Sequence, residues 1–273
     1  MKQMFFLHGL PRAGNTLLSS ILNQNPNIAL TANSVCPEML GMLNLVKGSG
    51  EFVNFPDYNS FDNVTKSLFE NYYKDWTQDY IIDRAPWGHP INLKNLREIE
   101  DNIKIIVLVR DVEEVLASFI KFTQTHLNSK FNSLVPSIEG KCNILLNPET
   151  FNLHRMLEGI KNLLDNESKE MYHLIDYHTL CNNPQETIEG IYKFLDIPLW
   201  DHRFTNLDQF EVNNMQYDDT RNDFGVGLHT IDTQNVYTNN HNENILPQHI
   251  IDRCKNLNFW KKHQKTQRGI FGS

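Results

Sequence analysis

Close to its start, the chain carries a loop that limits the choice of fold. A short apolar run at residues 4–7 leads into a stretch with the pattern GxxxxG-x-T, from Gly9 to Thr16, and apolar residues at helical spacing follow it. The first amides of a helix have no partner inside it, and the helix dipole is positive there, so such a loop binds anions well. Gly14 allows close approach of the backbone, and Thr16 adds a hydroxyl group. We therefore predict a strand, loop and helix that hold a phosphate-like group, with an ordinary turn as the alternative.

Strand-like and helix-like segments alternate along the chain. Short apolar runs predict strands at residues 4–7, 80–82, 103–109 and 171–175. Helical spacing predicts helices at residues 16–23, 37–46, 63–73, 112–122, 151–164, 184–195 and 248–257. Residues 125–150 have weak periodicity and suggest a loop-rich insertion. This alternation predicts an α/β fold with a central parallel sheet flanked by helices.

We expect one domain over residues 1–273, because no internal repeat or low-complexity linker divides the chain. Within it, residues 1–198 form the nucleotide-binding core. Residues 199–273 form a largely irregular C-terminal segment of the same domain, which ends in a basic tail.

The acidic composition narrows the classes of partner. The chain has 273 residues and a formal net charge of −8, so it has no overall attraction to nucleic acid or to an anionic membrane. We expect no nucleic-acid partner, and no membrane span because the apolar runs are short. The four cysteines are scattered without a CxxC pair, which fits a reducing, cytoplasmic location. An anionic ligand must then be held by a few local positive groups.

The chain differs from a nucleoside triphosphatase at two places, one in the loop and one at the end of a strand. Asn15 stands where such a loop has lysine, and the cation lies three positions earlier, at Arg12. The strong strand at 103–109 ends in Arg110 rather than in the acid that would hold Mg²⁺. Since no metal-ligand spacing is seen, we expect no metal cofactor. A P-loop-type nucleotide kinase or triphosphatase stays as an alternative.

The loop from Leu10 to Leu18 resembles the 5'-phosphosulfate loop of the sulfotransferases that use 3'-phosphoadenosine-5'-phosphosulfate (PAPS). The proline followed by a cation is typical of that family, whereas Ala13 and Asn15 replace its usual serine and threonine. The resemblance implies PAPS as co-substrate. It also implies that the loop contacts the donor through Arg12, Ala13, Gly14, Asn15, Thr16 and Leu17.

A second stretch is similar to the family's 3'-phosphate motif. The strand at 105–109 is followed by Arg110, and Ser118 lies eight residues later on the expected helix. Ligands bind at the carboxyl ends of strands in open α/β sheets, and arginine can grip a phosphate with two parallel hydrogen bonds. The resemblance thus assigns Arg110 and Ser118 to the 3'-phosphate. The alternative is an arginine that pairs with an acid at the start of the helix, with a serine on a solvated face.

Two weaker matches complete the resemblance, which spans residues 4–198. Tyr177 would contact the adenine, although His178 replaces the family's usual glutamate. Residues 83–86 look like the Asp-Lys-x-Pro segment of bacterial and tyrosylprotein sulfotransferases, which implies that Arg84 lies near the transferring sulfuryl group. The alternatives are a packed tyrosine and a salt bridge at a strand end. The implied fold is the P-loop NTPase-like sulfotransferase fold.

The resemblance implies metal-independent, in-line transfer of a sulfuryl group from PAPS to a hydroxyl or amine acceptor. Arg12 and Thr16 would stabilise the charge that grows on the leaving phosphate. A hydroxyl acceptor also needs a base, and the sequence leaves that base open. In the tyrosylprotein branch the base is a glutamate that falls near Asn33 here. Glu38 is the nearest carboxylate to that position, Asp83 and His89 are its competitors, and His229 is a further outsider.

The acceptor has no readable signature. A glycan, a lipid, a small alcohol or phenol, or a peptide tyrosine would all suit the chemistry. Residues 38–75, 125–150 and 200–245 are expected to form its pocket. A catalytically inactive protein that still binds PAPS, or its product adenosine 3',5'-bisphosphate (PAP), is a further alternative.

Overall fold

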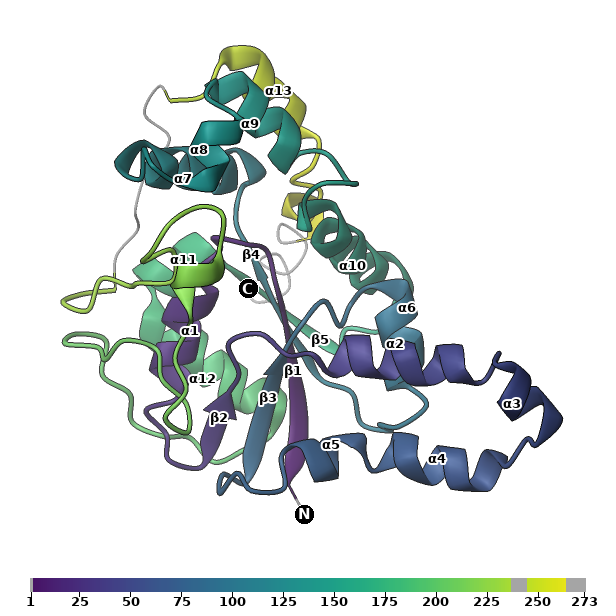
Figure 1. The fold of residues 1–273 in the computed structure, drawn as a ribbon. Helices are drawn as coiled ribbons and strands as arrows, with labels where there is room; N and C mark the ends of the chain where they lie inside the picture. Colours follow the sequence, from purple (N-terminus) through teal and green to yellow (C-terminus); the bar gives the residue numbers. More distant parts are fainter. Residues whose placement is uncertain (1, 237–244, 264–273) are drawn as a thin grey trace.

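The computed structural model describes residues 2–236 and 245–263, and its centre is one five-stranded sheet (Figure 1). All neighbouring strands are parallel, in the order β2-β3-β1-β4-β5. Their bounds are β1 Gln3–Gly9, β2 Ile28–Leu30, β3 Tyr80–Arg84, β4 Ile105–Val109 and β5 Tyr172–Asp176. Parallel sheets are covered on both faces, so their strands are largely apolar, and β4 is buried at every position. The predicted α/β fold with a parallel sheet is confirmed.

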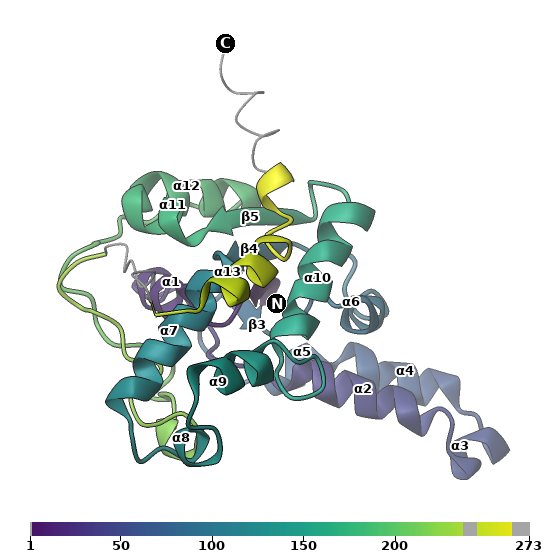
Figure 2. The ribbon, with the colours of Figure 1, turned by 90° about the horizontal axis from the view of Figure 1, so that it is seen from above.

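Helices cover both faces of the sheet. Figures 1 and 2 show α1 and α12 on one side and α6 and α10 on the other. The helices in the first half of the chain are α1 Asn15–Leu22, α2 Cys36–Val46, α3 Gly50–Asn54, α4 Tyr58–Lys66, α5 Leu68–Tyr72, α6 Pro90–Leu96 and α7 Val112–Thr125. Those in the second half are α8 Lys130–Leu134, α9 Ile138–Leu145, α10 Leu153–Asn166, α11 Tyr177–Asn182, α12 Pro184–Leu195 and α13 Gln248–Lys255. The pair α2 and α4, joined by α3, projects away from the sheet (Figure 1).

Several elements differ from those expected. The helix expected at 63–73 is divided between α4 and α5, and α3, α6 and α11 were not expected. Residues 125–150 are not only loops, because they contain α8 and α9. Both helices start at a serine whose side chain accepts a backbone hydrogen bond, at Ser129 and Ser137. The strand β2 was not expected, since three residues are too few to display a strand pattern.

The segment after β5 and α12 is largely irregular in its described part. It contains the short 3-10 helix η1, Asp219–Arg221, and an isolated bridge between Thr205 and Asn235. Helix α13 then packs against α7. The basic tail beyond residue 263 lies outside the described residues. No helix in the described ranges has both the length and the apolar character that crossing a bilayer requires.

Candidate functional site

The carboxyl ends of the strands open into a cleft of about 920 Å³ that is continuous with solvent. The loop after β1 forms one wall, and residues 228–235 of the C-terminal segment form another. The lining residues are Pro11, Arg12, Gly14, Asn15, Thr16, Leu17, Arg84, Arg110, Ser118, Phe119, Tyr177, Leu228, His229, Thr230, Ile231, Asp232 and Asn235. Most residues that the sequence assigned to a donor nucleotide therefore share one cleft.

The loop between β1 and α1 depends on its two glycines. Gly14 has φ of 89°, and a Cβ there would lie 2.8 Å from Cδ2 of Tyr177. A Cβ on Gly9 would lie 1.8 Å from Oδ1 of Asn15. The side chain of Asn15 is buried and donates from Nδ2 to the carbonyl of Leu10 at 2.7 Å. Asn15 thus braces the loop, and any contact it makes with an anion is left to its backbone.

Arg12 adopts a left-handed backbone conformation, with φ of 59°, which is uncommon for a residue with a side chain. Its Nε donates to Oγ of Ser118 at 3.1 Å, and its Nη1 donates to the carbonyl of Leu228. Burial, together with the nearby charge of Arg110, lowers the pKa of Arg12 to about 10. A buried guanidinium beside a second one favours an anion between or next to them.

Arg110 reaches the same loop from the end of β4. Its Nη1 donates to the carbonyl oxygen of Arg12 at 3.1 Å, and its guanidinium lies 4.1 Å from the ring centre of Tyr177. Its Nε also donates to Glu114 at 2.9 Å, so Arg110 both lines the cleft and pairs with a helix-start acid. The structure thus shows the pairing with a helix-start acid that the sequence offered as the alternative, while the contact of Arg110 with a 3'-phosphate stays a prediction.

Glu114 joins a small charged cluster that the sequence did not reveal. It lies 2.9 Å from Nε2 of His178 as well as pairing with Arg110. Burial alone would raise the pKa of Glu114, but Arg110 and His178 hold it below its ordinary value. The available signal was an acid, Glu114, in the first turn of the helix that follows Arg110.

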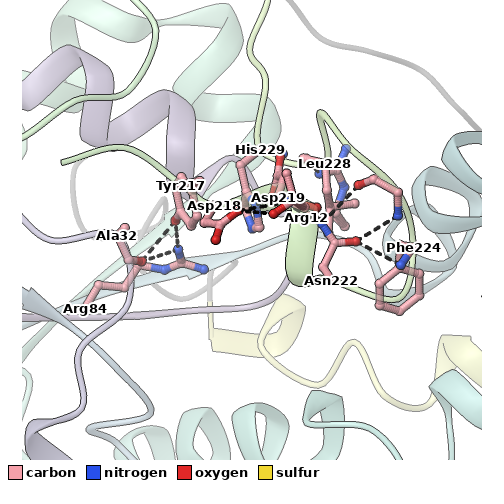
Figure 3. Close-up of polar contacts among 12 residues, drawn as sticks. Arg12, Ala32, Arg84, Tyr217, Asp218, Asp219, Asn222, Phe224, Leu228 and His229 are labelled. Atoms are coloured by element: carbon pink, nitrogen blue, oxygen red, sulfur yellow. Dashed lines mark hydrogen bonds and ion pairs between the residues drawn. The ribbon is translucent and has the colours of Figure 1, made fainter. Parts of the chain in front are cut away.

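Arg84 stands between the main cleft and a second one of about 600 Å³. Its Nη1 donates to the carbonyl of Ala32 at 2.6 Å and to the hydroxyl of Tyr217 at 2.5 Å (Figure 3). The second cleft is lined by Gly9, Asn33, Ser34, Glu38, Arg84, Ala85, Pro86, Asn152 and Met156. Glu38 thus faces this second cleft, where it lies 3.9 Å from Arg155 and is largely exposed.

Three residues named from the sequence lie outside both clefts. Asp83 is fully buried, accepts hydrogen bonds from the hydroxyl of Tyr73 and from Nε1 of Trp87, and lines neither cleft. Its burial does not favour a catalytic role for Asp83, which stays a prediction. Ala13 is also fully buried, and His89 pairs with Glu158 at 3.4 Å; neither lines a cleft.

A polar cluster from the C-terminal segment faces the main cleft (Figure 3). The ring of His229 stacks on Tyr217 with centroids 3.8 Å apart and planes 3° apart. Nδ1 of His229 lies 2.5 Å from Oδ1 of Asp219. The sequence gave this histidine only as an outsider, because the surrounding stretch has no motif or periodicity to mark it.

Comparison with known proteins gives a consistent result. The model of the sulfotransferase family matches residues 5–202, which is more than half of the chain. Protein-tyrosine sulfotransferase A of Caenorhabditis elegans is 24% identical over 226 residues, covering 75% of this chain and 52% of the relative. The chain therefore spans about half the length of that relative.

The fold also has a counterpart among solved structures. The sulfotransferase domain of the olefin synthase from Synechococcus PCC 7002 matches with a TM-score of 0.52 at 15% identity, covering 92% of this chain and 94% of that one. This likeness confirms the fold that the sequence resemblance implied. Given the extent of the family match, the chain belongs to the sulfotransferase family.

Proposed function

We propose that the protein transfers a sulfuryl group from PAPS to a hydroxyl or amine acceptor. The observation that carries this proposal is the convergence of Arg12 and Arg110, which come from the ends of β1 and β4, in one cleft. PAPS carries a phosphosulfate at one end and a 3'-phosphate at the other, so two separate cationic groups in one crevice suit it. Family membership agrees with this activity.

Each end of the donor has a matching set of groups in the proposal. The backbone amides at the start of α1, with Arg12 and Thr16, hold the 5'-phosphosulfate. Arg110 holds the 3'-phosphate, while Ser118, which accepts from Arg12, lies between the two ends. The ring of Tyr177 packs against Arg110 and offers a flat surface for the adenine.

The transfer step is an in-line displacement at sulfur. The acceptor oxygen forms a bond to sulfur as the bond from sulfur to the 5'-phosphate oxygen breaks, and the electron pair stays on the phosphate of PAP. Arg12 and the loop amides stabilise this growing charge, because they are already in place before the reaction. Arg84, between the two clefts, is close enough to both to contact the moving sulfuryl group.

We propose the second cleft as the acceptor site, since it meets the donor cleft at Arg84. Among glycans, lipids, small alcohols, phenols and peptide tyrosines, the peptide tyrosine is the first to test, because a relative is named for that activity. The cytoplasmic location expected from the sequence also stays a proposal, which four free, buried cysteine thiols support.

The test compares ligands before it compares acceptors. Isothermal titration should give tighter binding of PAP than of ATP with Mg²⁺. A panel of tyrosine peptides, phenols, sugars and lipids is then incubated with PAPS, and PAP formation is measured. Tighter binding of ATP would refute the sulfotransferase proposal. Binding of PAP without PAP formation on any acceptor would instead favour a nucleotide-binding protein without turnover.

A further inference from the structure

We propose that His229 is the general base that removes the proton from the acceptor, and that Asp219 and Tyr217 position it. This inference rests on the proposed function. It draws on Tyr217, Asp219 and His229, which lie beyond the region matched by the family model, and of which His229 lines the donor cleft.

The contacts of His229 fix both its orientation and its tautomer. Asp219 accepts from Nδ1 of the imidazole at 2.5 Å through one carboxylate oxygen, and from the backbone amide of His229 at 3.0 Å through the other. The ring of Tyr217 covers one face of the imidazole. With the proton held on Nδ1, the lone pair of the imidazole is on Nε2, which has no hydrogen-bond partner among the described residues.

His229 lies on the donor side of the place where the two clefts meet, which an acceptor oxygen must approach to reach sulfur. It lines the donor cleft with Arg12, which stabilises the leaving phosphate in the proposed function, and with Arg84, which lines both clefts. Two contacts link it to them. Leu228, the preceding residue, accepts from Arg12, and the stacked Tyr217 receives a hydrogen bond from Arg84 (Figure 3).

The other candidates fit less well. Asp83 lies outside both clefts, and Asn33 carries no titratable group. Glu38 lines the acceptor cleft, but its side chain is largely exposed and its ion-pair partner, Arg155, lies 3.9 Å away. His229 differs because an acid and a stacked ring hold it in one orientation.

The proton balance of the step is complete with these residues. The acceptor O–H gives its proton to Nε2 of His229 as the oxygen bonds to sulfur, and PAP departs with the electron pair of the broken sulfur–oxygen bond. The imidazolium that results is balanced by the carboxylate of Asp219. Release of that proton to solvent after product departure restores the base.

The charged and titratable groups around His229 set the pH range in which it is a base. Asp219 faces it from η1, Tyr217 from the stacked segment, Arg84 from β3 and Arg12 from the loop after β1, and Asp232 lines the same cleft. Burial lowers the pKa of His229 below 6.5, and the charges of Arg84 and Arg12 add to this, although Asp219 opposes it. The imidazole is therefore neutral near pH 7, as a base must be.

The experiment measures PAP formation from PAPS, which counts transfer to any acceptor, including water. The acceptors are 4-nitrophenol and a tyrosine peptide. His229→Gln should lower kcat by roughly 100-fold or more, and Asp219→Asn by less, since it only positions the base. Titration with PAP should show that both variants still bind the nucleotide. The matched control is His249→Gln, because His249 is exposed and pairs with Glu139 far from the cleft.

Two readouts separate a base from a merely structural residue. The wild-type rate should fall on an acid limb whose midpoint lies below pH 6.5, since the pKa of His229 is lowered from that value, and His229→Gln should lose this acid limb. Added imidazole should restore part of the activity of His229→Gly, but not that of Arg12→Ala. Glu38→Gln should keep the acid limb.

The outcomes distinguish this inference from the proposed function. A wild-type protein that neither binds PAP nor releases it from PAPS would overturn both. An active wild-type protein whose His229→Gln variant keeps its rate and its acid limb would overturn the inference alone. Loss of the acid limb in Glu38→Gln instead of His229→Gln would have the same consequence, and would assign the base to Glu38.

Discussion

Asp83 and Arg84 are neighbours in the chain, yet they serve different parts of the molecule. Successive side chains of a strand point to opposite faces. Arg84 contacts Ala32 and Tyr217 at the cleft, whereas Asp83 contacts Tyr73 and Trp87 in the core. A motif that contains both residues therefore assigns at most one of them to a site on a given face.

The buried carboxyl of Asp83 makes a prediction about stability and pH. Burial raises its pKa above the ordinary value of 3.8, despite hydrogen bonds from Tyr73 and Trp87. The folded state thus holds the proton more tightly, so its stabilising contribution is full below pH 3.8 and is lost as the pH rises through the folded pKa. Relative to Asp83→Asn, the wild-type free energy of unfolding should decline as the pH rises from 3.8 through the folded-state pKa of Asp83, and should level off above it.

Urea unfolding of both proteins across a pH series measures this difference. Asp83→Ala serves as the comparison, because it leaves the Tyr73 hydroxyl without its acceptor and should lower the free energy of unfolding by about 1–3 kcal/mol. A difference between wild type and Asp83→Asn that stays constant with pH would contradict the raised pKa.

The two arginines of the donor cleft make a second prediction at the residue scale. Arg110→Ala should weaken PAP binding by about 2–3 kcal/mol, because a charged, hydrogen-bonded contact is lost. Arg12→Ala should lower kcat more than it weakens PAP binding, if Arg12 acts on the leaving phosphate. Titration with PAP and steady-state rates measure the two effects.

The control for Arg110→Ala is Arg110→Lys, which keeps the positive charge near Glu114 but loses the planar guanidinium that can donate two parallel hydrogen bonds. A rate and an affinity that fall by the same factor in both alanine variants would argue against separate roles.

Among single residues, those that belong to a short sequence pattern could be predicted. Arg12 and Thr16 follow from a loop pattern, and Arg110 from a strand end, so their positions could be predicted. Tyr217, Asp219 and His229 could not, because they come together only through the path of an irregular segment. No spacing in the chain encodes that path.

At the scale of elements, the loop between β1 and α1 has the strictest requirements. Gly14→Ala should impose both a disfavoured positive φ and a clash with Tyr177. Since residues held in such conformations cost about 1–3 kcal/mol each, we expect a loss of stability in this range together with weaker PAP binding. Thermal unfolding and titration with PAP measure the two effects.

Gly41→Ala is the matched control. Gly41 lies within α2, and a Cβ there meets no atom within 4 Å. Alanine is the better helix former by about 1 kcal/mol, so this variant should be neutral or more stable. Equal destabilisation by both substitutions would show that the loop has no special constraint at Gly14.

The elements that could be predicted are the long or strongly apolar ones. The buried run at 105–109 and the periodic helices α10 and α12 have patterns that survive in a single sequence. The missed elements include β2, α3, α6, α8, α9 and α11, which have three to eight residues each. Their positions are fixed by packing and by capping serines rather than by their own periodicity.

At the scale of the whole molecule, the end of the C-terminal segment packs against residues within the range matched by the family model. We propose that residues 1–273 form a single domain, and the burial of two residues and one hydrogen bond support this. Trp260 is fully buried, as is Cys254 on α13. Oδ1 of Asn258 accepts from the backbone amide of Val112 at 2.8 Å, at the start of α7. The segment thus supports the helix that carries Ser118 and begins next to Arg110.

Trp260 allows this proposal to be tested with a pair of substitutions. Trp260→Ala should lower the free energy of unfolding by about 3–5 kcal/mol, because a large buried side chain leaves a cavity. Trp260→Phe should have a much smaller effect, since Nε1 is buried without a hydrogen-bond partner in the described structure and its removal forfeits no bond. Urea unfolding, monitored by far-UV and near-UV circular dichroism, measures both variants.

In a single domain, the two signals change together in the wild type and in both variants. Unfolding of Trp260→Ala in two steps, with PAP binding kept after the first step, would contradict the single domain. Residues beyond 202 would then fold as a separate unit, and α7 would not need the contact with Asn258.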